Sequence, residues 1–247
     1  MTKKFVLEVC TYSFQSCIIA EKAGAERVEL CDNQYEGGTT PSYGVIRQAR
    51  ESIGIELYPI IRPRGGNFVY DEAELAVMKH DIEVCKELHC DGISTGVQLS
   101  NGAIDKEAMM KIVQWAYPMK VTCHRVFDFT PDPFKALEDL IQSGCIRILT
   151  SGQEILAVEG IDVISKLVKA AGGRISIMPG AGVRASNNEY LVRKSGASEF
   201  HTSAKKKSPD AANTIKSDLM YLGHHYIADE AEIKNIISIG NKMLKSK

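Results

Sequence analysis

Short apolar runs of strand length alternate with longer stretches of helical periodicity along almost the whole chain. Eight of these runs are predicted as strands: Phe5–Val9, Arg27–Leu30, Glu56–Ile61, Gly92–Thr95, Lys120–His124, Ile146–Leu149, Arg174–Met178 and Glu199–His201. Strands separated by helices pair in parallel through right-handed crossovers. Eight such units within 247 residues predict an α/β protein with a single (β/α)8 TIM barrel.

Helical periodicity is clear in the stretch Asp71–Leu88, where Leu75, Met78, Ile82 and Cys85 recur three or four residues apart. Three further stretches are predicted as helices: Asp105–Trp115, Pro133–Ser143 and Glu154–Ala170. The competing architecture is an open doubly wound sheet. Because no G-x-G-x-x-G motif opens the first helix, the closed barrel is the preferred prediction.

No linker-like stretch rich in Pro, Ser or Gly divides the chain, so residues 1–247 are expected to form one domain. Residues 205–230 are long and mixed in composition, and we expect them to form an irregular insertion before the last helix. A lid, an arm to another subunit and a mobile loop are the alternatives for this insertion. The sequence leaves the oligomeric state open, including a homo-oligomer.

The charge balance argues against polyanionic partners. With 30 basic and 31 acidic residues, the chain has no overall field to attract nucleic acid or an anionic membrane. Lys3 and Lys4 precede only a short apolar stretch, which Glu8 interrupts, so no export signal is expected. Seven cysteines without a CxxC pair are expected to be reduced thiols in the cytoplasm.

In TIM-barrel proteins, the functional residues lie at the carboxyl ends of the strands. The predicted strand ends carry an unusual number of polar side chains. Those considered as catalytic candidates are Glu8, Glu29, Arg62, His124, Asp128 and His201. His124 is a candidate general acid or base with Asp128 as its orienting partner, and His201 is similar. A structural role for each histidine is the alternative.

Side chains alternate faces along a strand, so Glu8 shares a face with Cys10, and Glu29 shares one with Cys31. The two cysteines could form a two-thiolate site for a soft metal such as Cu(I), or act as small core residues. A disulfide between them is disfavoured by the compartment. The two glutamates could be catalytic, or could form buried ion pairs with Arg62 or Arg125.

A second candidate site follows the last strands of the predicted barrel. Glycine-rich turns before helices bind phosphate through backbone N–H groups, and barrels often place such a site after strands seven and eight. The residues considered for this anion site are Thr150, Ser151, Gly180, Gly182 and Ser203. Tight turn geometry is the alternative for the two glycines. Arg62 and Arg64 could also bind an anionic substrate, or could close the barrel mouth by pairing with the glutamates.

Ten short motifs carry a family resemblance. They are Glu8–Cys10, Arg27–Cys31, Glu36–Ser42, Ile61–Gly66, Met78–Ile82, Asp91–Gly92, Thr122–Asp128, Leu149–Gly152, Met178–Gly182 and Glu199–His201. Together and in this order they resemble the CutC family of copper homeostasis proteins. The resemblance runs from near residue 5 to about residue 204. It implies a cytoplasmic TIM barrel with a role in copper handling, and places Cu(I) ligands on Cys10 and Cys31.

Two main hypotheses follow. The first is a CutC-like protein of copper homeostasis that binds Cu(I). The second is a TIM-barrel enzyme of lyase or isomerase type, acting on a small anionic or phosphorylated substrate with His124 or Glu8 as acid or base. The ring of Glu, Arg and His at the strand ends motivates the second, because a copper carrier needs only a few soft ligands. A purely structural or interaction protein has the least support.

Overall fold

The computed structural model describes residues 4–208 and 225–245. Eight strands form its centre: β1 (Val6–Thr11), β2 (Arg27–Leu30), β3 (Glu56–Pro59), β4 (Gly92–Thr95), β5 (Lys120–Cys123), β6 (Arg147–Thr150), β7 (Ser176–Pro179) and β8 (Glu199–Thr202). Parallel hydrogen bonding joins them in two four-stranded sheets, in the orders β3-β2-β1-β8 and β4-β5-β6-β7.

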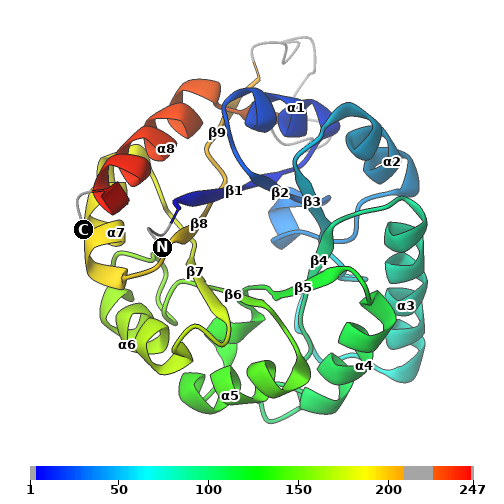
Figure 1. Cartoon of the computed structure of the whole chain (residues 1–247). Coiled ribbons are helices and arrows are strands. Elements are labelled where there is room, and N and C mark those ends of the chain that lie inside the picture. The colour runs from blue at the N-terminus through cyan, green and yellow to red at the C-terminus, as the bar shows by residue number, and fades with distance from the viewer. Residues whose placement is uncertain (1–3, 209–224, 246–247) are drawn as a thin grey trace, which may run out of the picture.

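The two sheets close into a ring (Figure 1). A parallel bridge between Ile60 and Ser94 connects the end of β3 to β4, and β7 lies beside β8 at the other seam. The predicted α/β class and (β/α)8 TIM barrel are therefore confirmed.

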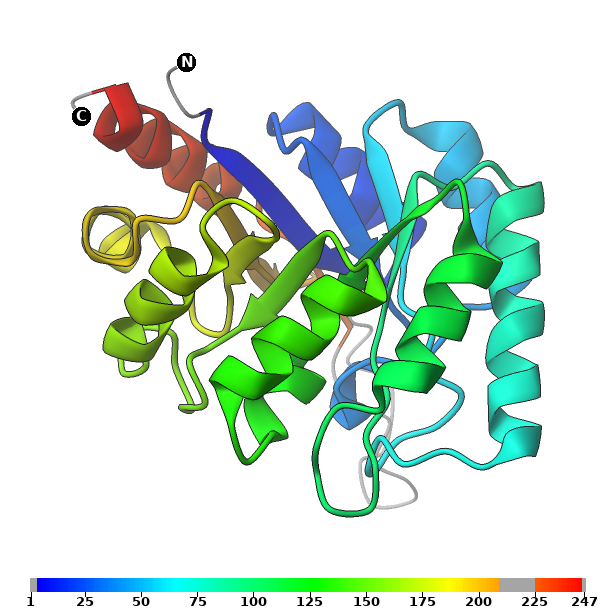
Figure 2. The same cartoon turned by 60° about the horizontal axis from the view of Figure 1, so that its bottom comes forward.

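Among the described residues, eight α-helices pack around the outside of the strands (Figure 2). They are α1 (Phe14–Lys22), α2 (Tyr43–Ser52), α3 (Glu72–Glu87), α4 (Lys106–Ala116), α5 (Pro133–Ser143), α6 (Ile161–Ala171), α7 (Ala185–Ser195) and α8 (Glu230–Lys245). Short 3-10 helices, η1 (Gln34–Glu36) and η2 (Arg125–Phe129), follow β2 and β5. Within the described ranges, no helix is long and apolar enough to cross a membrane.

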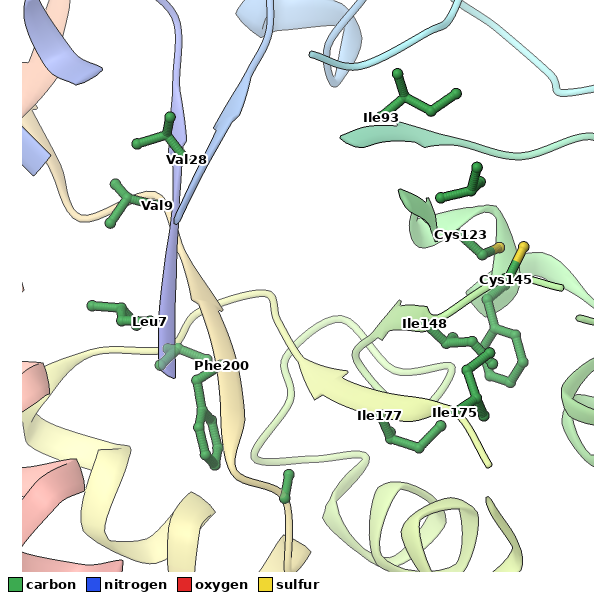
Figure 3. Close-up of a cluster of buried hydrophobic side chains, with 14 of the residues drawn as sticks. Leu7, Val9, Val28, Ile93, Cys123, Cys145, Ile148, Ile175, Ile177 and Phe200 are labelled. Atoms are coloured by element: carbon green, nitrogen blue, oxygen red, sulfur yellow. The ribbon is translucent and has the colours of Figure 1, made fainter. Parts of the chain in front are cut away.

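The apolar core lies between the strands and the helices. Figure 3 shows Leu7 and Val9 of β1, Val28 of β2 and Phe200 of β8 in this layer. Because side chains alternate along a strand, the residues between these apolar positions face the interior of the barrel. Five cysteines are also buried in the core: Cys17, Cys85, Cys90, Cys123 and Cys145.

Two predicted segments differ from the structure. The helix expected over Glu154–Ala170 begins only at Ile161, because the preceding residues form a loop in which the backbones of Gly152 and Gly160 meet. The segment 205–230 is ordered at both ends, where β9 (Lys205–Lys207) pairs antiparallel with β10 (Tyr226–Ala228). The remainder of that segment, 209–224, lies outside the described residues.

Candidate functional site

Two thiols meet inside the barrel near the carboxyl ends of β1 and β2. The Sγ atoms of Cys10 and Cys31 are 3.9 Å apart. The parallel register places Cys10 opposite Glu29, and the Cys31 amide donates to the Thr11 carbonyl at 2.8 Å. Donor atoms of Cys10, Glu29 and Cys31 all lie within 4.8 Å of one another. The sequence prediction that these two thiols are neighbours on adjacent strands agrees with this geometry.

His201 reaches the same place from β8. Its Cα lies opposite that of Glu8, and its Nδ1 is 2.7 Å from Glu8 Oε1. Its Nε2 is 3.9 Å from Glu29 Oε2. Three adjacent strands, β8, β1 and β2, therefore bring an imidazole, two thiols and two carboxylates together, although they come from distant parts of the chain.

The ionisable groups of this cluster shift one another's pKa values. Burial disfavours a charged His201, but Cys10 and the two carboxylates outweigh it and raise the pKa of His201 well above its usual range. The hydrogen bond from Cys31 lowers the pKa of Cys10 well below that of an ordinary thiol, and His201 also lowers it. The pKa of Cys31 is raised by the same contact with Cys10 and by burial.

The pKa values of Glu8 and Glu29 are shifted in opposite directions, because the two side chains have different neighbours. Burial, together with the charge on Cys10, raises the pKa of Glu29 to about 8. Burial also disfavours the charge on Glu8, but Arg27 and His201 lower its pKa far below its usual range. At neutral pH, Glu8 is therefore a carboxylate, whereas Glu29 tends to hold a proton.

Glu8 belongs to a buried ion-pair network. It bonds Arg27, which is 2% exposed and also reaches Glu199 at 2.7 Å. Arg147 reaches Glu199 at 2.6 Å, and both guanidinium groups lie over the ring of Tyr58. The expected pairing of Glu8 with Arg62 or Arg125 is wrong, because Arg27 stands directly opposite Glu8 in the register of β1 and β2.

Arg62 and Arg64 do not pair with the barrel glutamates either. Arg62 donates to the backbone carbonyls of Glu36, Gly38 and Gly66 at 2.6 to 2.9 Å. Arg64 pairs with Glu74 at the start of α3. In the described parts of the chain, Glu29 has His201 as its only cationic partner within 4.0 Å.

A cavity of about 550 Å³ opens above the thiols, between the loops that follow the strands. Its polar lining includes Cys10, Glu29, Arg62, His124 and His201. Its apolar lining includes Ile60, Phe68, Phe129, Leu149 and Val183. The volume is typical of a pocket for a small organic molecule.

His124 and Asp128 are not partners. His124 is 4% exposed, and its Nδ1 accepts a hydrogen bond from the Val126 amide at 3.2 Å. Asp128 instead accepts from the Ser151 amide at 3.0 Å and from Arg125 at 2.8 Å. The expectation that Asp128 orients His124 is therefore wrong: the short helix η2 directs Asp128 toward the loop after β6.

The residues considered for an anion site are divided between two places. Gly182 and Ser203 line the cavity, whereas Thr150 and Ser151 are buried and bond Asp128. The Gly180 amide donates to the Thr150 carbonyl at 2.9 Å. At the start of α7, the Ala185 amide donates to Glu232 at 2.9 Å and the Arg184 amide to Asn187 at 2.9 Å. These two amides already have acceptors within the protein.

Comparison with known proteins agrees with the resemblance found in the sequence. The model of the CutC family matches residues 5–206. This chain belongs to the CutC family. A family protein CutC of Parabacteroides distasonis is 53% identical over 203 residues, which cover 82% of this chain and 84% of that protein. The human copper homeostasis protein cutC homolog is 41% identical over 230 residues, covering 93% of this chain and 84% of that protein.

Solved structures agree with both family and fold. The crystal structure of a CutC from Streptococcus agalactiae matches with a TM-score of 0.77 at 38% identity, covering 81% of this chain and 98% of that one. An N-(5'-phosphoribosyl)anthranilate isomerase from Pyrococcus furiosus matches with a TM-score of 0.59 over 96% of this chain and 99% of that one. Its 12% identity shows a shared barrel fold alone.

Sequence reasoning missed several residues that shape this CutC-family site. Arg27, Arg147 and Glu199 form the buried ion pairs that hold Glu8, and Phe68 covers part of the cavity wall. The available signal was charge inside a strand: Arg27 alternates with Val28 and therefore faces the barrel interior, as does Glu29. Phe68 lies in a loop, where no periodicity indicates the direction of its side chain.

Proposed function

We propose that this CutC-family chain takes part in copper handling and binds Cu(I) through Cys10 and Cys31. The observation that carries the proposal is the 3.9 Å separation of the two sulfur atoms. Thiolates are the ligands that select Cu(I). Human and mouse relatives at 41% identity carry the name copper homeostasis protein, which supports the same role here.

The thiol spacing suits a shared metal ion. Metal–thiolate bonds of roughly 2.3 Å, as in zinc sites, let two sulfurs share one ion at any separation up to about 4.6 Å. Cys10 and Cys31 satisfy this limit without backbone movement. At their separation the ion lies off the line between the sulfurs, so that a third ligand has room.

Glu29 has a donor atom within 4.8 Å of both thiols, and His201 beside it is the softer candidate for a third ligand. Metal-binding histidines usually donate their second ring N–H to a carboxylate, which fixes the ring. The 2.7 Å contact between His201 Nδ1 and Glu8 Oε1 is of this kind, and Nε2 is left on the side of Glu29 and the thiols. Binding requires a neutral imidazole and two thiolates, so Cu(I) uptake by this site releases protons.

A cytoplasmic location is part of the proposal. All seven cysteines are free thiols, including the close pair of Cys10 and Cys31. A reducing compartment keeps thiols in this form, and it also keeps copper as Cu(I).

Anaerobic titration with Cu(I) against a chromogenic chelator tests the site. We expect the wild type to take up one ion per chain, and the Cys10→Ser, Cys31→Ser double variant to take up none at the same chelator concentration. Cys17→Ser is the matched control, because Cys17 is buried nearby with contacts to Thr11 Oγ1 and the Ser13 carbonyl that a serine hydroxyl can keep. Equal uptake by the double variant and the wild type would refute this site.

The cavity beside the thiols supports a second candidate, an enzyme of lyase or isomerase type acting on a small anionic substrate. Among the catalytic residues named from the sequence, Glu8 is a poor base, because Arg27 stabilises its charge. Asp128 bonds Ser151 and Arg125 and does not orient His124. Glu29 and His201 both line the cavity and remain candidates. Hydrogen–deuterium exchange into metabolites incubated with the protein, observed by NMR and compared with Glu29→Gln, tests this role. Exchange no faster than in protein-free samples would count against it.

A further inference from the structure

Two hydrogen-bond donors in the cavity wall have no acceptor. The Nε of Arg62 and the Nε2 of His124 are both buried without a partner, in side chains that are 5% and 4% exposed. Both residues line the cavity. Buried donors are nearly always satisfied, so two unsatisfied donors in residues that line one cavity indicate a missing acceptor.

The charge of Arg62 is also uncompensated. Its three hydrogen bonds of normal length go to neutral carbonyls, and its other polar neighbour is the neutral Tyr70 hydroxyl. Within the described ranges, no carboxylate lies within 4.0 Å of its nitrogens. Every other arginine with a side chain less than 10% exposed, namely Arg27 and Arg147, has a glutamate partner. A buried cation without a counter-charge is unfavourable, so Arg62 favours an anion in the cavity.

His124 adds a neutral donor beside this charge. Burial and the nearby Arg62 lower its pKa to about 3, so the ring is neutral at physiological pH. Because Nδ1 accepts a hydrogen bond from the Val126 amide, the single ring proton resides on Nε2. Nε2 is therefore a donor that does not repel Arg62.

One aromatic ring covers both groups. The Phe68 ring centre is 4.9 Å from the Arg62 guanidinium and 5.0 Å from the His124 ring centre. Phe129 packs against Phe68 at 5.9 Å and is 64% exposed at the mouth. An entering molecule that turns Phe68 aside reaches both donors and finds aromatic surface for an apolar part.

The other charged residues that line the cavity also favour an anion. Arg184 lines the cavity and forms no ion pair with the described residues, and Arg125 lies at the same mouth, paired with Asp128. The acidic residues of the lining are Glu29 and Glu36, so the three arginines outnumber them.

We propose that this cavity binds a small organic anion, whose carboxylate or phosphate group accepts hydrogen bonds from Arg62 and from Nε2 of His124. The apolar part of the ligand packs on Phe68 and Phe129. This site differs from the glycine-turn anion site expected from the sequence, because its donors are side chains that follow β3 and β5. It also uses different donor groups from the proposed copper site, whose ligands are the thiols of Cys10 and Cys31.

Three probes with one aromatic body separate charge from shape: benzoate, phenyl phosphate and the neutral benzamide. Calorimetry at fixed ionic strength is expected to show saturable binding of benzoate or phenyl phosphate, with benzamide at least tenfold weaker. The preferred anion identifies a carboxylate or a phosphate site. Binding of neither anion, or equal binding of benzamide, would overturn the proposal.

Variants assign the binding to these donors. His124→Asn keeps an acceptor for the Val126 amide but removes Nε2, and we expect at least tenfold weaker binding of the preferred anion. Arg62→Lys should weaken it as well, whereas Arg174→Gln, which removes an exposed arginine paired with Glu138, should leave it unchanged. Full affinity in both His124→Asn and Arg62→Lys would refute the assignment. The Cys10→Ser, Cys31→Ser variant should still bind the anion, so that failure of either proposal is recognised separately.

Discussion

The imidazole of His201 is held 2.7 Å from the Glu8 carboxylate, at adjacent positions of β8 and β1. The other oxygen of the same carboxylate bonds Arg27 from β2. One glutamate thus joins the buried ion pairs of the barrel interior to the thiol cluster above them, and changes at Glu8 should affect both.

Glu8→Gln should destabilise the protein strongly. Removing one partner of a buried ion pair leaves the other charge uncompensated, which typically costs about 3 kcal/mol or more. Urea denaturation at neutral pH measures the change in the free energy of unfolding. Glu138→Gln is the control, because it breaks an exposed pair with Arg174 and should barely move the midpoint. Equal midpoints for the two variants would contradict the role given to Glu8.

The free energy of unfolding of the wild type should fall with rising pH relative to that of the Glu29→Gln variant. The pKa of Glu29 is raised from 4.5 to about 8, so the folded state holds a proton that the unfolded state releases. The associated stability is complete below pH 4.5 and is lost progressively up to about pH 8. Between pH 5 and 6, the difference between the two proteins should change by about 1 kcal/mol, since one proton per molecule corresponds to about 1.4 kcal/mol per pH unit.

Denaturation curves at several pH values test this difference. The pH interval below 6 reports on Glu29 alone. The pKa of His201 is raised from 6.5, so the stability that His201 contributes is lost only when the pH rises above 6.5. A wild-type curve parallel to that of Glu29→Gln would show that Glu29 ionises normally.

Cys10 should be the most reactive thiol of the chain near pH 6.5. It lines the cavity and has a lowered pKa, whereas burial raises the pKa of core thiols such as Cys17 and Cys145. Brief iodoacetamide treatment followed by peptide mass spectrometry should find Cys10 alkylated at least tenfold faster than any other cysteine. His201→Gln should slow the reaction, because it removes the neighbouring positive charge. Preferred labelling of a core cysteine would be inconsistent with the lowered pKa of Cys10.

Gly160→Ala should destabilise the loop before α6. A Cβ at Gly160 would lie 2.0 Å from the Ser151 carbonyl oxygen and 2.8 Å from Gly152 Cα, so the backbones must separate. We expect a loss of about 2 kcal/mol, typical of overpacking at a rigid site. Gly44→Ala is the matched control: it lies in α2 with no atom within 4 Å of a new Cβ, and should be neutral or stabilising. Thermal unfolding of both variants measures the contrast.

Local signals in the sequence were sufficient to predict most of the helices and strands. Pro133–Ser143 has the predicted bounds because Asp132 caps the Phe134 and Lys135 amides, and Gly144 ends the helix with a φ of 87°. Apolar positions also placed Arg27–Leu30 and Gly92–Thr95 correctly. The failure over Glu154–Ala170 arose because apolar residues in a loop imitate helical spacing: Ile155 is 81% exposed.

The site was predicted only in part, because pairing across strands depends on register. Alternation put Cys10 and Cys31 on one interior surface, as observed. It could not show that Arg27 lies opposite Glu8, or that Asp128 turns toward Ser151. Those contacts depend on the stagger between strands and on loop conformation. Neither can be predicted from the periodicity of the sequence.

The three carbonyls bound by Arg62 come from two different loops, those after β2 and β3. One guanidinium group therefore holds both loops together, and their conformational entropy is lost on folding. A molecule entering the cavity meets two loops that are already held in place, so the rearrangement left for binding is the rotation of the Phe68 side chain. Selectivity at this mouth then rests on complementarity of charge and shape rather than on loop closure.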